Sequence, residues 1–193
     1  MNKITKSGST FCLDNFPWEK EFPARPETRV TISWNETGFS VHFVSFETNL
    51  RAVETAHNTL VCQDSCMELF MQYAPATDPR YINLEMNPNC AAYAAIRFDR
   101  KRSQMIDPAD IAMLGIRSAV YDDRWELDYT VPVAFIQKYI PTYRHEVGAI
   151  LRGNFYKCGD LTDHPHYACF NNITLPNPDY HRPEFFAEFV LAE

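Results

Sequence analysis

Short segments in which apolar and polar residues alternate recur along most of this chain of 193 residues. The clearest is YINLEMN (81–87), where Ile82, Leu84 and Met86 fall on one side of an extended chain. Because side chains point to opposite faces of a strand in turn, this pattern predicts a strand with one face in a core. The other side carries an aromatic ring, two amides and a carboxylate: Tyr81, Asn83, Glu85 and Asn87. That second face is either ordinary polar surface or the floor of a polar binding site.

Similar alternation, interrupted by turn signals, predicts about nine or ten short strands. Residues 29–34 and 38–47 flank the turn NETG and predict a hairpin, and residues 66–98 predict a meander of three strands. A second hairpin is expected within residues 116–132, with its turn at Asp122–Asp123. The remaining predicted strands lie in three C-terminal segments: 146–158, 166–173 and 184–192.

One short helix is predicted over residues 131–141, because Pro132 suits a first helical turn and Pro141 cannot continue a helix. Residues 102–115 are expected to be irregular, and residues 48–61 fit either a short helix or a loop. Strands and helices do not alternate in the rhythm that a parallel sheet requires.

The fold class that follows is all-β. We expect a single antiparallel β-sandwich, with jelly-roll or immunoglobulin-like layers and one short helix, over residues 1–193. Within it, residues 1–28 contain the Pro-rich and charged stretch FPWEKEFPARPE and are expected to form an extended lead-in. Trp34 and Trp125 lie on apolar faces of predicted strands and are expected in the core.

Charge and hydropathy exclude two classes of partner. The net charge is −7, whereas nucleic-acid binding needs a basic stripe, and the cluster RFDRKR (97–102) is interpreted as a solvated loop. No segment reaches the ~18 apolar residues of a membrane helix, and no apolar signal-peptide core follows the early lysines. These features favour a cytoplasmic over a secreted location. The six cysteines are accordingly expected to be free and mostly buried thiols.

Motifs of several enzyme classes are absent, including GxSxG, the P-loop, GxGxxG and HExxH. Glu68 and Glu85 are predicted to face the same way on neighbouring strands, so they could serve as the two acids of a glycosidase. Outward carboxylates on a sheet are more often solvated, or accept hydrogen bonds from ligand hydroxyl groups.

The segment CGDLTDHPHYAC (158–169) combines two Cys, two His and two Asp, yet its spacing matches no zinc finger or ribbon. It is interpreted as a turn-rich loop between two strands. No cofactor is required, although oxygen ligands there or near Asp122–Asp123 would suit structural calcium.

Sugar recognition needs aromatic rings for the apolar faces of a pyranose, and amides or carboxylates for its hydroxyl groups. The polar face of residues 81–87 supplies groups of the second kind, and the aromatic-rich C-terminal loops could supply the first. Asn154 and Tyr156 lie on a strand side that could extend such a site.

Four segments, in order, resemble the family 9-like carbohydrate-binding proteins. They are VCQDSCMELFMQY (61–73), YINLEMNPNCAAYAAI (81–96), WELDYTVPVAFI (125–136), and a C-terminal group with LRGNFYKCGD, HYACFNNI and PDYHRPEFFAEFVL (151–191). The likeness runs from about residue 29 to the C-terminus. It implies a non-catalytic β-sandwich that holds small sugars or polysaccharide ends between two aromatic rings, sometimes with structural calcium, and that could work beside a glycoside hydrolase.

The resemblance also implies roles for single residues. Glu68 stands at the position of the family's acidic sugar ligand, and Glu85 and Asn87 stand at a polar pair on the adjacent strand. Tyr180 corresponds to one aromatic wall, whereas Cys62 stands where the other wall is a Trp. The expected ligand-binding set is Glu68, Glu85, Asn87 and Tyr180, with Asn83 and Asn154 at the margin. Phe170 replaces a family Trp and is expected in the core.

Two other functions remain open at this stage. A glycoside hydrolase using Glu68 and Glu85 would cleave a chromogenic glycoside. A haem- or metal-binding sandwich would need axial ligands such as Met67, Met71 or His42 facing one pocket.

Overall fold

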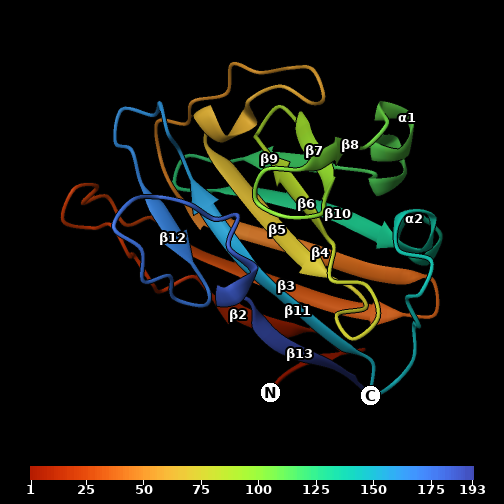
Figure 1. Ribbon diagram of the computed structural model, residues 1–193. Coiled ribbons are helices and arrows are strands. Elements are labelled where there is room, and N and C mark those ends of the chain that lie inside the picture. The colour runs from red at the N-terminus through yellow and green to blue at the C-terminus, as the bar shows by residue number, and fades with distance from the viewer.

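The computed structural model describes residues 1–193 and shows two β-sheets packed face to face (Figure 1). The larger sheet has eight strands, in the order β1 (Asn2–Thr5), β13 (Ala187–Ala192), β11 (Ile150–Cys158), β5 (Cys66–Gln72), β6 (Tyr81–Met86), β7 (Ala92–Arg97) and β8 (Ser103–Met105), with β12 (Tyr167–Cys169) beside β11. The smaller sheet has five, in the order β2 (Ser9–Cys12), β3 (Glu27–Asn35), β4 (Gly38–Phe46), β10 (Trp125–Pro132) and β9 (Arg117–Val120). The predicted β-sandwich is therefore confirmed.

The two predicted hairpins and the meander lie in these sheets. β3 pairs with β4 across the NETG turn, and β9 pairs with β10 across the turn at Asp122–Asp123. Gly38 is required where β4 begins, since its φ is +149° and a Cβ there would lie 2.3 Å from the carbonyl oxygen of Val131. β5, β6 and β7 form the predicted meander, in antiparallel register.

The first residues are part of the sandwich, because β1 joins the larger sheet and β2 the smaller one. β1 pairs with β13 in parallel, with Asn2 opposite Phe189 and Thr5 opposite Ala192. The polar sequence of β1 does not indicate a strand, and its only sheet partner is β13, near the other end of the chain. The sandwich is thus antiparallel in all of its strand pairs except this one.

The helices are short and lie at the periphery of the sheets. α2 (Val133–Tyr139) confirms the predicted helix, with Pro132 at its N-cap and Pro141 just beyond its end. The stretch expected to be irregular contains β8 and also α1 (Pro108–Ile111), whose N-cap Asp107 accepts a hydrogen bond from the amide of Ala109. Three single-turn 3-10 helices complete the structure: η1 (Val61–Gln63), η2 (Ala112–Leu114) and η3 (Pro183–Phe185). No helix is long and apolar enough to cross a membrane.

The main core lies between the two sheets. Met67, Leu69 and Met71 of β5 face it from the larger sheet, and Trp34 and Trp125 face it from the smaller one, as predicted. Phe170 packs against this core, as expected.

A second, smaller apolar cluster lies on the outer face of the larger sheet, under the loops that cover that face. Trp18 and Tyr180 belong to it, and the indole of Trp18 donates a hydrogen bond to the carbonyl oxygen of Leu175. These loops bury the polar face of β6, where Asn83 is 0% and Glu85 is 6% exposed. Of the two alternatives for that face, ordinary solvated surface is therefore excluded.

Candidate functional site

A pocket of about 220 Å³ opens on the outer face of the larger sheet. β6, β5 and β11 form its floor, and the walls come from η1, the loop after β11, the start of β12 and the loop around residue 180. The lining residues are Cys62, Glu68, Phe70, Glu85, Cys158, Asp160, Tyr167, Pro178, Asp179, Tyr180 and His181.

Glu68 and Glu85 lie directly opposite each other on β5 and β6. Both are buried, with exposures of 2% and 6%. Oε1 of Glu68 accepts a hydrogen bond from the thiol of Cys158 at 2.9 Å, and Oε1 of Glu85 accepts one from the amide of Asn83 at 2.8 Å. Asn83 in turn accepts a hydrogen bond from Nε of Arg97 at 3.0 Å, so it lies behind Glu85 and orients it.

This burial favours the neutral forms of both carboxyl groups. Burial raises the pKa of Glu85 to about 7, although the nearby Arg97 guanidinium opposes the shift. Burial, and then the charge of Glu85, raise the pKa of Glu68 well above its usual range. At neutral pH the pair therefore offers an O–H donor next to carboxyl oxygens that accept.

The pocket carries no positive charge of its own. No Lys or Arg lines it, and burial, followed by the charge of Arg97, lowers the pKa of His181 to about 4. Asp179 is paired with Arg100, 2.6 Å away. Asp160 also lines the pocket. Burial raises the pKa of its carboxyl group, and hydrogen bonds from Tyr167 and Cys62 partly offset this increase.

Aromatic rings form much of the wall. Tyr180 is 8% exposed, and its ring stacks on Tyr156 with 4.0 Å between centroids. Its hydroxyl group donates hydrogen bonds to the backbone oxygens of Lys157 and Ala168. One face of this ring and its polar group are thus already engaged, so it can offer a ligand only the remaining edge and face.

The rings of Tyr167 and His181, which also line the pocket, are more exposed to solvent than that of Tyr180. Tyr167 is half-buried and lies nearly perpendicular to Tyr180, with 6.2 Å between centroids. The imidazole of His181 stacks on Phe70 at 4.9 Å.

Three residues of the sequence-predicted set lie outside the pocket: Asn83, which lies behind Glu85, and also Asn87 and Asn154. Asn87 is fully buried and donates to the carbonyl oxygen of Glu54 and to Oδ2 of Asp64, both at 2.8 Å. Asn154 is also buried, and its amide exchanges two hydrogen bonds of 2.8 Å with the backbone of Asn171. Both amides hold loops that cover the sheet, and their polar groups face protein atoms.

Sequence reasoning did not assign Asp160, Tyr167, His181 or Cys158 to a saccharide site, although all four line the pocket. Three of these residues belong to the segment 158–169, whose mixture of Cys, His and Asp was the available signal. Cys62, which stands at the family's Trp position, does line the pocket.

The proposed haem ligands are not brought together. Met67 and Met71 are buried in the core between the sheets. His42 lies on the smaller sheet, partly exposed, with Nδ1 2.9 Å from Asp128. The structure therefore contradicts a haem pocket built from these three residues.

A second buried polar cluster lies beside the site. The ammonium group of Lys157, which is 0% exposed, lies 2.9 Å from Oε2 of Glu47 and 2.6 Å from Nε2 of His166. Glu47 also accepts hydrogen bonds from the hydroxyl of Ser65 and the indole of Trp125. This network joins the strand that carries Lys157 to the opposite sheet.

Known structures resemble this arrangement over nearly the whole chain. A candidate carbohydrate-binding protein from Bacteroides uniformis ATCC 8492 superposes with a TM-score of 0.85 and 24% identity, over 100% of this chain and 97% of the other. A family 9 carbohydrate-binding module from Caldicellulosiruptor kristjanssonii, solved with glucose, gives a TM-score of 0.60 and 12% identity, over 88% and 78%. A module from the same organism, solved with cellotriose, gives 0.65 and 10%, over 98% and 92%.

At these identities the structural likeness establishes the fold. No curated protein matches the chain in sequence. The sequence model of the family described as "Carbohydrate-binding family 9" matches residues 3–191, which is almost the entire chain. The chain therefore belongs to carbohydrate-binding family 9.

Proposed function

We propose that this chain binds a small saccharide, or the terminal sugar of a polysaccharide, in the pocket above Glu68 and Glu85, without converting it. The observation that carries the proposal is the pair of opposed, buried carboxyl groups at the floor of an aromatic-walled pocket. Membership in a family of non-catalytic binding modules supports it, as do the glucose and cellotriose bound by structural relatives.

The paired carboxyl groups match the chemistry of a sugar. A pyranose presents neighbouring hydroxyl groups that both donate and accept, and the Glu68/Glu85 pair offers both functions at neutral pH. Tyr167 and the free side of Tyr180 would cover the C–H faces of the ring.

The size of the pocket argues for one sugar ring. Its volume of about 220 Å³ lies below the ~300 Å³ at which pockets for drug-sized ligands begin. A single ring, or the last ring of a chain, fits such a space better than an internal segment of a polysaccharide. Because the thiol of Cys62 has no face on which a sugar can stack, we expect weak binding, with a Kd of about micromolar to millimolar.

Calorimetric titration with glucose, xylose, cellobiose, xylobiose and the corresponding alditols tests the proposal. We expect Glu85→Ala to weaken sugar binding at least about tenfold, since it removes one donor–acceptor partner. Glu126→Ala is the matched control, because Glu126 lies on the smaller sheet and pairs with Arg124. Reduced alditols should bind more weakly than the sugars if an intact terminal ring is recognised. Absence of heat with every sugar, from folded protein, would contradict the proposal.

The same samples test hydrolysis. Incubation with chromogenic glycosides should release no dye, and release that Glu68→Gln abolishes would replace the binding proposal with a hydrolase. Thermal unfolding repeated with calcium or with a chelator tests whether structural calcium stabilises the fold. A co-purification with glycoside hydrolases would test a working partnership.

A further inference from the structure

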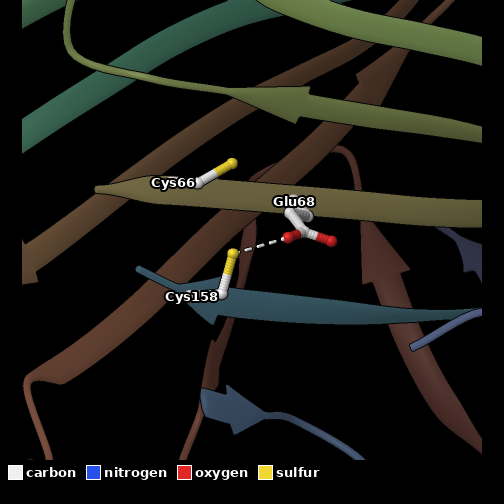
Figure 2. A group of neighbouring side chains, drawn as sticks. All are labelled: Cys66, Glu68 and Cys158. Carbon is white, nitrogen blue, oxygen red and sulfur yellow. Dashed lines mark hydrogen bonds between the residues drawn. The ribbon is translucent and has the colours of Figure 1, made fainter. Parts of the chain in front are cut away.

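The register of two neighbouring strands gathers thiols at the floor of the pocket. Cys66 and Glu68 are two residues apart on β5, so their side chains share one face of the sheet. Cys158 lies directly opposite Cys66 on β11. Figure 2 shows the three side chains on the same side of these two strands, with the Cys158 thiol directed at the Glu68 carboxyl group.

The three side chains converge closely enough to share one ion. Sγ of Cys66, Sγ of Cys158 and a carboxyl oxygen of Glu68 all lie within 4.8 Å of one another. Two thiolates bound to one tetrahedral zinc, each at 2.3 Å, stand about 3.8 Å apart. Rotation about the Cα–Cβ bonds is the movement that would close the remaining distance, since the strands themselves are fixed by their pairing.

The surroundings favour a cation. Cys66, Glu68 and Cys158 are buried, with exposures of 0%, 2% and 2%. The carboxyl groups of Glu68, Glu85 and Asp160 all face a pocket that no Lys or Arg lines. The ionised forms of such buried groups need an ion or a positive partner to stabilise them, and the pocket lining supplies no such partner.

The ligand types select the class of ion. Two sulfurs and one carboxylate oxygen suit zinc and similar thiophilic ions, whereas calcium and magnesium require a shell of oxygen ligands. Three protein ligands also leave a fourth tetrahedral position free. Because Glu68 and Cys158 line the pocket and Cys66 lies behind them, that fourth position would face the pocket.

We infer that Cys66, Glu68 and Cys158 bind a divalent thiophilic cation of the zinc class, with its remaining coordination position open to the pocket. The two thiol protons and the proton of the neutral Glu68 carboxyl group pass to solvent when the ion binds. Water, or a hydroxyl group of a bound saccharide, completes the coordination. The site itself does not depend on saccharide binding, and it is tested in the absence of sugar.

Cobalt(II) is the probe, because thiolate coordination gives it a near-ultraviolet charge-transfer band. We expect the full-length protein, reduced with a phosphine and freed of reductant, to develop this band at one cobalt per chain and to lose it when zinc is added. Cys66→Ser and Cys158→Ser should lower zinc affinity by at least about 100-fold, more than the loss of an outer-shell partner costs. Cys169→Ser is the matched control, since Cys169 is also buried but its thiol faces the carbonyl oxygen of Asn15.

Two results would overturn the inference. Wild-type protein that keeps its fold by circular dichroism, yet shows no cobalt band and no zinc-induced rise in Tm, would exclude the site. So would a Cys66–Cys158 disulfide in freshly purified protein, because opposed cysteines on antiparallel strands can also be linked. A thiol titration in denaturant should count six free thiols per chain, and a count of four with these two peptides joined would identify the disulfide. Failure of this test would leave sugar binding unaffected, and failure of sugar binding would leave the cobalt spectrum unaffected.

Discussion

The carboxyl groups of Glu68 and Glu85 face each other across two neighbouring strands, almost sealed from solvent, with no Lys or Arg in the pocket that they share. Such a pair raises the free energy of the folded state, because burial and mutual repulsion both act against charge. Strain of this kind is typical of sites that retain polar groups for a ligand.

The first prediction is that Glu85→Gln stabilises the metal-free protein at alkaline pH. The pKa of Glu85 is raised in the folded state from 4.5 to about 7. Between these pH values the Glu85 carboxyl group is therefore protonated in the folded protein and ionised in the unfolded chain. Stability should therefore fall as pH rises from about 4.5 to about 7, by up to about 3 kcal/mol, and stay low above that. Urea unfolding at pH 5 and pH 8, with a chelator present, should show the variant gaining only at pH 8. An equal effect at both values would contradict the shift.

The second prediction has the opposite sign and concerns His166. Burial and the charge of Lys157 lower its pKa from 6.5 to about 4, and its Nε2 accepts a hydrogen bond from Lys157 at 2.6 Å. The unfolded chain takes up the proton first, so stability should fall as pH drops from about 6.5 to about 4. In His166→Gln, which keeps an acceptor but does not titrate, this loss should shrink. His164→Gln is the control, since its side chain is exposed, and it should keep the full loss.

The third prediction is that Asn87 stabilises the fold and does not contact the ligand. Asn87→Ala should cost about 2–4 kcal/mol of folding stability, because the backbone amides of Asn89 and Ala91 lose their acceptor and Asp64 loses one of its donors. Its effect on sugar affinity should be smaller than that of Glu85→Ala. Asn172→Ala, at an exposed position, should leave the unfolding midpoint unchanged. A selective loss of sugar affinity with unchanged stability would assign Asn87 to the ligand instead.

The fourth prediction concerns the two functions of Tyr180. Tyr180→Phe removes only the hydroxyl group that donates to the backbone oxygens of Lys157 and Ala168. We expect a stability loss of about 1–3 kcal/mol with sugar affinity retained, because the ring wall remains. Tyr180→Leu should weaken both. Sugar affinity lost in the Phe variant would show that the hydroxyl group contacts the ligand.

The positions of most strands were predictable, because apolar and polar residues alternate along a strand that has one face in the core. It located β3, β4, β5, β6 and β7, and the flanking prolines located α2. It did not reveal β1, whose only sheet partner is β13 at the other end of the chain. Pairing between distant segments leaves no local pattern, so the lead-in was not recognised as part of both sheets.

Of the candidate site, only the floor of the pocket could be predicted from the sequence. Glu68 and Glu85 follow from strand period and register, and both line the pocket. Asp160 and His181 come from loops whose positions depend on tertiary contacts. The amides of Asn87 and Asn154 look the same in sequence as ligand-binding amides, yet the structure directs them to protein backbone and side-chain groups. Their roles depend on loops that fold over the sheet, which strand periodicity does not describe.

The parallel pairing of β1 with β13 has a mechanical consequence. The chain enters at the start of β1 and leaves at the end of β13, so tension applied to residues 1 and 193 pulls these strands lengthwise past each other. In that geometry the hydrogen bonds between the strands bear the load together and cannot open one at a time. The fold would therefore resist extension at this strand pair when it is pulled through its two ends.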